Sequence, residues 1–217
     1  MSRTARSIGA VGLLAFVGAG AARAQSTVNE WWNELDLYWT APSAQWRLFG
    51  LAQDARGIEN TDRQLTLGLH VDDLAMPWGF ARIGFRTIRS ISGPSAPEDR
   101  ALAEVTVPDT KGRIRIRNRV RLELRWIGGE PSQRWRYRAQ VEDHVPLPAK
   151  RELVPYATAE VYWDSRYHAL SRSAYRLGST ITIVPRWVFD LSGARQDNRF
   201  GAPRHVNALW SRLEVSY

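Results

Sequence analysis

The 217-residue chain contains no cysteine and only two lysines, Lys111 and Lys150, among its 30 basic residues. Without cysteine the chain forms no disulfide, offers no thiolate ligand for a metal and has no residue for a lipoprotein anchor. Nearly all of its positive charge is therefore arginine. After residue 25 the chain also lacks any apolar run near the roughly 20 residues of a spanning helix, which excludes helical membrane crossings there.

The first 24 residues are expected to be a cleaved secretory signal peptide. Arg3 and Arg6 precede an uncharged apolar and small-residue run, 8–22, and Ala22 and Ala24 supply the small side chains of a cleavage site. The alternative, a retained membrane anchor, needs a longer apolar run. The sequence thus predicts a single mature domain over 25–217. The whole chain has a net charge of +8, and export excludes nucleic acid as the partner of this charge.

The mature chain is dominated by a period of two residues, most clearly from Arg113 to Trp126. Apolar residues occupy the even positions and charged residues the odd ones, with Asn118 as the exception. A helix would scatter these arginines around every face, whereas a strand places them all on one side. This segment is therefore predicted to be a strand with one apolar and one charged face.

Similar alternation predicts strands of a length that crosses a bilayer when tilted. The predicted strands are 31–40, 45–54, 63–73, 78–90, 101–107, 113–126, 133–143, 153–164, 174–184, 186–196 and 205–217. Links 55–62, 91–100, 165–173 and 197–204 are expected to be extracellular, and 41–44, 74–77 and 185 periplasmic. Single-chain bacterial barrels have even strand numbers, so either 101–107 is a loop or residues 25–30 form a further strand.

These features favour an all-β fold, an antiparallel up-and-down transmembrane β-barrel of 10–12 strands, with twelve preferred over ten. A soluble periplasmic β-sandwich also alternates apolar and polar residues, but its polar face would not carry such dense arginine. Tyr217, an aromatic residue that ends an alternating strand, resembles the assembly signal of outer-membrane barrels. The expected location is the outer membrane after cleavage near Ala24, with membrane lipid and the barrel assembly machinery as partners.

The strands also resemble a bacterial family known as domain of unknown function 2490. The similarity lies in the segments 32–36, 64–69, 117–125, 135–138, 160–162 and 175–178 and in the aromatic terminus, and covers essentially the whole mature chain. The resemblance implies an outer-membrane barrel. It supplies no activity and no catalytic residues.

The arginines of two neighbouring strands form the main candidate site. If the apolar side meets lipid, these side chains point into the lumen, where they need carboxylates, water or anions beside them. The candidate arginines are Arg115, Arg117, Arg119, Arg121, Arg134, Arg136 and Arg138. The candidate carboxylate partners are Glu34, Asp36, Glu123, Glu142, Glu160 and Glu214. Arginine suits either a structural ion-pair network or an anion passage, because its planar fork pairs with carboxylate or phosphate.

Three functions remain open at this point. The leading hypothesis is a narrow anion-preferring channel or carrier, and the alternative is a non-transporting barrel for envelope integrity or partner binding. A lipid-modifying enzyme comes third, because His168, Ser165, Ser171 and Ser173 share the expected loop 165–173 and Asp164 lies close by. His144 beside Asp143 and Glu142 is not expected to bind metal, since side chains alternate along a strand. No enzymatic activity, metal or cofactor is predicted.

Overall fold

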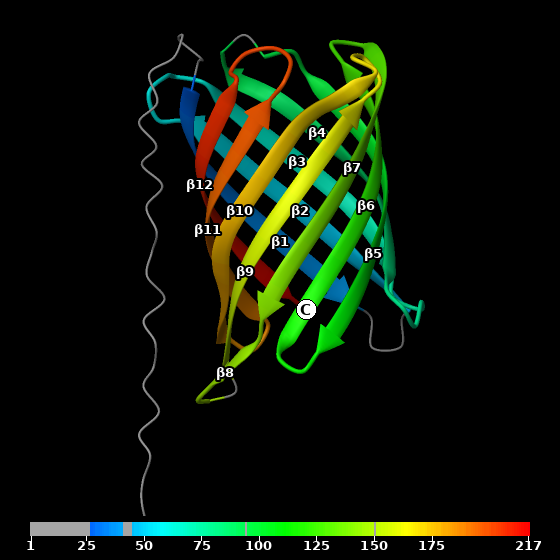
Figure 1. Ribbon diagram of the computed structural model, residues 1–217, viewed down its shortest axis with the longest axis vertical. Helices are drawn as coiled ribbons and strands as arrows, with labels where there is room; N and C mark the ends of the chain where they lie inside the picture. The colour runs from blue at the N-terminus through cyan, green and yellow to red at the C-terminus, as the bar shows by residue number, and fades with distance from the viewer. Residues whose placement is uncertain (1–26, 41–44, 94, 150) are drawn as a thin grey trace, which may run out of the picture.

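The computed structural model describes residues 27–40, 45–93, 95–149 and 151–217, and their regular structure is entirely β (Figure 1). The strands are β1 (Thr27–Thr40), β2 (Trp46–Gly57), β3 (Arg63–Asp73), β4 (Phe80–Ser92), β5 (Glu98–Lys111), β6 (Ile114–Ile127), β7 (Glu130–Asp143), β8 (Val145–Leu147), β9 (Arg151–Asp164), β10 (Ala169–Val184), β11 (Trp187–Asn198) and β12 (His205–Ser216). Within these ranges no helix is long and apolar enough to cross a membrane. The signal peptide predicted over 1–24 lies outside the described residues.

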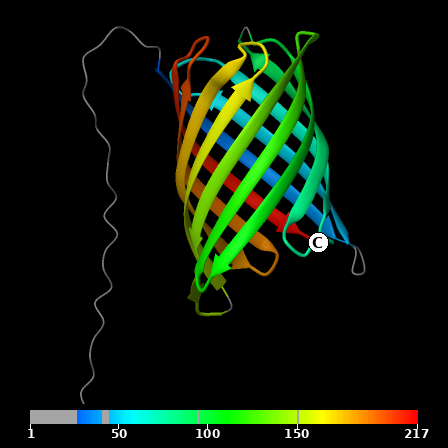
Figure 2. The ribbon, with the colours of Figure 1, turned by 45° about the vertical axis from the view of Figure 1, so that its right-hand side comes forward.

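The strands close into a barrel and are strongly tilted relative to its axis (Figures 1 and 2). Neighbouring strands pair antiparallel around most of the wall, and the three-residue β8 continues the line of β7 along β9. The closing pair is parallel: β1 lies beside β12 from Thr27 opposite His205 to Tyr38 opposite Ser216. The closed circuit therefore contains eleven strands.

An even strand number was expected, and this expectation is wrong. The weak segment 101–107 is part of a full strand, β5, and residues 27–30 begin β1 instead of forming a further strand. Pro108 fits into β5 because the pairing with β4 ends at Thr106, so no ladder bond on that side needs its missing N–H. Parallel closure permits the odd number, because it places the start of β1 at the end of the barrel opposite Tyr217.

The connections fall into two groups, one at each end of the barrel. Links 58–62, 95–97, 128–129, 165–168 and 199–204 share the end where β1 begins. Links 74–79, 112–113, 148–149 and 185–186 share the end of Tyr217, whose N–H donates to the Tyr38 carbonyl at 2.9 Å. The links expected to be extracellular fall in the first group, and the expected periplasmic links 74–77 and 185 fall in the second. The remaining expected periplasmic link, 41–44, lies outside the described residues.

The two faces of the wall differ sharply in polarity. Large apolar side chains are exposed on the outside, including Leu35, Leu69, Ile83, Phe85, Val105, Val120, Leu124, Val141, Leu177, Leu191 and Leu209. Charged side chains are buried inside, including Asp36, Asp72, Arg82, Glu104, Arg119, Arg121, Glu123, Arg125, Arg134, Glu142, Glu160, Asp164 and Asp190. This polarity is the reverse of a soluble barrel and is typical of a wall that faces lipid.

Replacing Gly84 by alanine is expected to destabilise the barrel by about 1–3 kcal/mol through overpacking. Gly84 lies opposite His70, and an added Cβ would lie 2.0 Å from His70 Cδ2 and 2.8 Å from the Leu69 carbonyl oxygen. Urea unfolding followed by tryptophan fluorescence measures the effect. Gly50→Ala is the control, because a Cβ at Gly50 meets nothing within 4 Å. Equal effects of the two substitutions would contradict this packing.

Candidate functional site inside the barrel

The site is built on two adjacent strands, β6 and β7, whose arginines face the interior. Their register places Arg119 opposite Arg138 and Arg121 opposite Arg136, so like charges meet directly across the strands. Such pairs repel each other, and the repulsion grows where water is excluded. The fold therefore requires carboxylates between the arginines.

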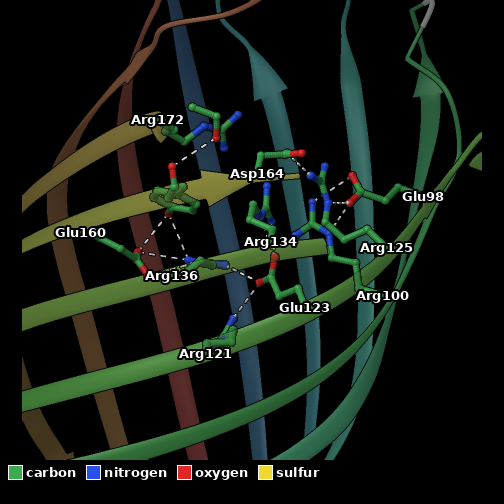
Figure 3. Close-up of polar contacts among 12 residues, drawn as sticks. Glu98, Arg100, Arg121, Glu123, Arg125, Arg134, Arg136, Glu160, Asp164 and Arg172 are labelled. Atoms are coloured by element: carbon green, nitrogen blue, oxygen red, sulfur yellow. Dashed lines mark hydrogen bonds and ion pairs between the residues drawn. The ribbon is translucent and has the colours of Figure 1, made fainter. Parts of the chain in front are cut away.

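Glu123 supplies one of these carboxylates from β6 itself. It accepts hydrogen bonds from Arg134 Nε and Arg136 Nη1, both at 2.7 Å, and Arg121 Nη1 lies 3.5 Å from its Oε1 (Figure 3). Its side chain is only 1% exposed. One buried carboxylate thus holds three arginines.

Glu160, on β9, performs the same role on the other side of β7. It accepts hydrogen bonds from Arg119 Nη2 at 2.6 Å, from Arg136 Nε and Nη2 at 3.0 Å, and from the Tyr162 hydroxyl at 2.9 Å. Arg136 therefore bridges Glu123 and Glu160, as Figure 3 shows. Its guanidinium also stacks over the Tyr162 ring at 4.5 Å, which fixes the plane of its fork.

The network extends through two carboxylates of β5 that sequence reasoning did not select. Glu104 accepts a hydrogen bond from Arg121 Nε at 2.7 Å and pairs with Arg119 at 3.4 Å. Glu98 pairs with Arg100 at 2.7 Å and also with Arg125, which in turn binds Asp164 at 2.7 Å. The alternation of β5 is the signal that could have found both, once Pro108 is accepted within the strand.

A second polar layer lies toward the Tyr217 end. Tyr38, Phe49 and His70 form a continuous stack with ring centroids 4.6 and 4.8 Å apart. Asp72 holds Arg47 at 2.7 Å and Arg82 at 2.5 Å, and these guanidiniums lie over the Tyr38 and Phe49 rings. This layer fills the interior between β1, β2, β3 and β4.

Arg212 of β12 lies close to three carboxylates of the barrel interior. It lies 3.6 Å from Asp36, 3.1 Å from Asp190 and 2.7 Å from Glu214. The sequence candidates Asp36 and Glu214 thus share one arginine, which was not among the candidate residues.

The structure brings most of the sequence candidates together but not all of them. Arg119, Arg121, Arg134 and Arg136 form the central network with Glu123 and Glu160, and a separate pair joins Arg117 to Glu142 at 3.1 Å. Among the residues the structure describes, Arg115, Arg138 and Glu34 have no oppositely charged group within 4.0 Å. The seven candidate arginines therefore differ in whether they have a carboxylate partner.

Two of the residues noted for enzymatic chemistry are engaged in structural contacts. Asp164 is turned inward and bound to Arg125 and Arg166, and the Ser165 hydroxyl accepts the Gln133 N–H at 2.8 Å. Among the described residues, no group of three or more His, Cys, Asp and Glu side chains is arranged to hold a metal ion.

Comparisons with known proteins agree with the barrel architecture. The chain is similar in structure to LpxR from Salmonella typhimurium, with a TM-score of 0.51 and 10% sequence identity over 79% of this chain and 83% of that one. At this identity the likeness concerns the fold alone. No curated protein matches the chain significantly. A family described as "Protein of unknown function (DUF2490)" matches residues 28–207, as the resemblance of the strands predicted. The chain belongs to this DUF2490 family.

Proposed function

We propose that the protein is an integral outer-membrane barrel whose interior is a rigid ion-pair network that fills the lumen, so that the barrel does not transport solutes. The observation that carries this proposal is the burial of the network. The side chains of Arg121, Glu123 and Glu104 are 3%, 1% and 3% exposed. Groups that water can hardly reach do not line an open aqueous pore.

The membrane location is supported by the outer face and by strand length. Apart from β8, the strands contain 11 to 16 residues, against the roughly 9–11 that a tilted strand needs to cross a bilayer. A wall with exposed leucine, valine and phenylalanine outside and arginine inside is stable where lipid surrounds it. Export through a signal peptide cleaved near Ala24 and assembly through Tyr217 belong to the same proposal.

The network also accounts for a structural role. It links β5, β6, β7 and β9 through Arg119, Arg121, Arg136 and their carboxylates. Opening a passage would separate these buried charges, which is costly because each would lose its partner without gaining full hydration. A barrel braced in this way suits envelope integrity or the presentation of its loops to a partner.

A narrow anion channel or carrier is the second candidate. It is favoured by Arg138 and Arg176, two interior arginines that have no carboxylate within 4.0 Å among the described residues. Under this alternative the ion pairs would form a constriction and these two groups would attract anions.

Recordings in planar bilayers separate the two functions. The refolded mature protein is expected to give no conductance steps, whereas a Glu123→Ala, Arg136→Ala double variant, which removes the centre of the network, is expected to conduct. Arg113→Ala is the control, because Arg113 is 63% exposed and pairs with Asp143 at the barrel end. Anion-selective steps from the wild-type protein would overturn the closed-barrel proposal in favour of the channel.

A further inference from the structure

Several interior arginines stand apart from the ion-pair network, and two of them lie beside the same strand. Arg138, on β7, and Arg176, on β10, lie near the middle of their strands and have no carboxylate within 4.0 Å among the described residues. Both are only half-buried, although they lie on the inner face of the wall. Part of each guanidinium-bearing side chain therefore remains accessible. Arg86 and Arg172 also lack a carboxylate among the described residues, but they bind His70 and Asn198 instead.

The register places the two arginines on either side of β9. Arg138 lies opposite Glu160, and Arg176 lies opposite Thr158, two residues further along the same face. Arg119 flanks Arg138 on the other side.

The carboxylates of the central network that neighbour Arg138 are already engaged, whereas Glu34, an interior carboxylate without an ion pair, lies more than 4.0 Å from any arginine among the described residues. Glu160 binds Arg119 and Arg136 with its two oxygens, and Glu104 binds Arg121 and Arg119. Arg138 therefore adds a positive charge that these acids do not balance. An uncompensated guanidinium inside a barrel attracts an anion.

Unused hydrogen-bond donors gather around the same arginines. The Nε atoms of Arg119 and Arg176, Thr158 Oγ1 and Trp210 Nε1 are buried without a hydrogen-bond partner. Each of these atoms carries a hydrogen that it can donate, and a buried donor without a partner is costly. Arg176 is held in place between the rings of Trp210 at 4.2 Å and Tyr156 at 5.0 Å. The region therefore combines excess positive charge with excess donors.

We infer that Arg138, Arg176 and Thr158 form a binding site for a small oxyanion of the phosphate type. A guanidinium pairs with a tetrahedral oxyanion through two parallel hydrogen bonds, and the hydroxyl adds a third donor. An acyl-bearing ligand does not fit a site enclosed by the barrel wall, so the ligand is a free inorganic or small organic anion. This site is independent of whether the barrel conducts.

The test uses inorganic phosphate as the probe. Mature protein is refolded in detergent in the presence of radiolabelled phosphate, and binding is measured by equilibrium dialysis at constant ionic strength. Saturable binding of about one phosphate per barrel is expected. Arg138→Gln and Arg176→Gln are expected to weaken it roughly ten-fold to a hundred-fold, because each removes a charged two-point contact. Arg100→Gln is the matched control, since Arg100 is a half-buried interior arginine that is paired with Glu98.

Two further outcomes would overturn the site. One is wild-type protein that shows no saturable binding, and the other is binding that Arg138→Gln and Arg176→Gln leave unchanged. If these variants do not refold, Thr158→Val decides, because it keeps the side-chain shape and removes only the hydroxyl. It is expected to weaken binding several-fold, and an unchanged affinity would exclude Thr158 and with it the proposed site. Bilayer recordings address the closed lumen separately, so the two proposals can fail independently.

Discussion

Replacing Glu123 by leucine is expected to lower the free energy of unfolding by about 3–5 kcal/mol. The substitution removes the carboxylate that Arg121, Arg134 and Arg136 share in a nearly water-free interior. The three guanidiniums then keep the cost of burial and gain their mutual repulsion, while leucine offers no acceptor. The loss therefore exceeds that of an ordinary surface ion pair.

Reversible urea unfolding of the refolded barrel in lipid vesicles measures this loss. Glu130→Leu is the matched control, because Glu130 is exposed at the first residue of β7, beside the turn that follows β6, and should change stability little. Adding Arg134→Met to Glu123→Leu should recover part of the loss, since the pair then becomes apolar and one stranded charge disappears. A loss from Glu123→Leu no larger than that of the control would mean that the network does not stabilise the barrel.

The period of two residues was sufficient to predict the strands and their two faces. The alternation of Val120 and Leu124 with Arg119, Arg121 and Glu123 is local, and a strand converts it directly into an outer and an inner face. The described residues separate in this way, with Val120 and Leu124 exposed and Arg119, Arg121 and Glu123 buried. Local pattern therefore predicted the all-β fold and the placement of individual side chains.

Strand number and closure could not be predicted from the same pattern. The closing pair joins Thr27 to His205, which lie at opposite ends of the chain, and periodicity does not state whether such a pair is parallel or antiparallel. The even-number rule assumes antiparallel closure, so it excluded the eleven-strand circuit. Only the three-dimensional closure of the wall decides this feature.

The ion pairs depend on register, which composition does not reveal. Glu104 meets Arg121 because they are directly opposite across β5 and β6. Arg138 is directly opposite Glu160 in the same sense, yet Glu160 is taken by Arg119 and Arg136. The sequence could therefore list some of the charged partners, but it could not say which pairs form or which arginines remain without a carboxylate.

Placing arginine at Val120 is expected to cost about 2–4 kcal/mol when the barrel is embedded in a bilayer. Val120 is the seventh residue of the 14-residue strand β6, 47% exposed on the outer face between Val105 and Tyr137. Its replacement would place a guanidinium against acyl chains, where it can neither hydrate nor find a partner. Unfolding from phosphatidylcholine vesicles measures the cost.

Ile114→Arg is the control on the same face of the same strand. Ile114 is the first residue of β6 and is 40% exposed, so an arginine there can reach the headgroups and should cost only about 0–1 kcal/mol. The difference between the two variants reports depth in the membrane, because both add the same charge to the same strand. A soluble barrel would tolerate both equally, since water would hydrate either arginine. Equal and small costs at Val120 and Ile114 would therefore refute the membrane location, even if Glu123→Leu proved severe.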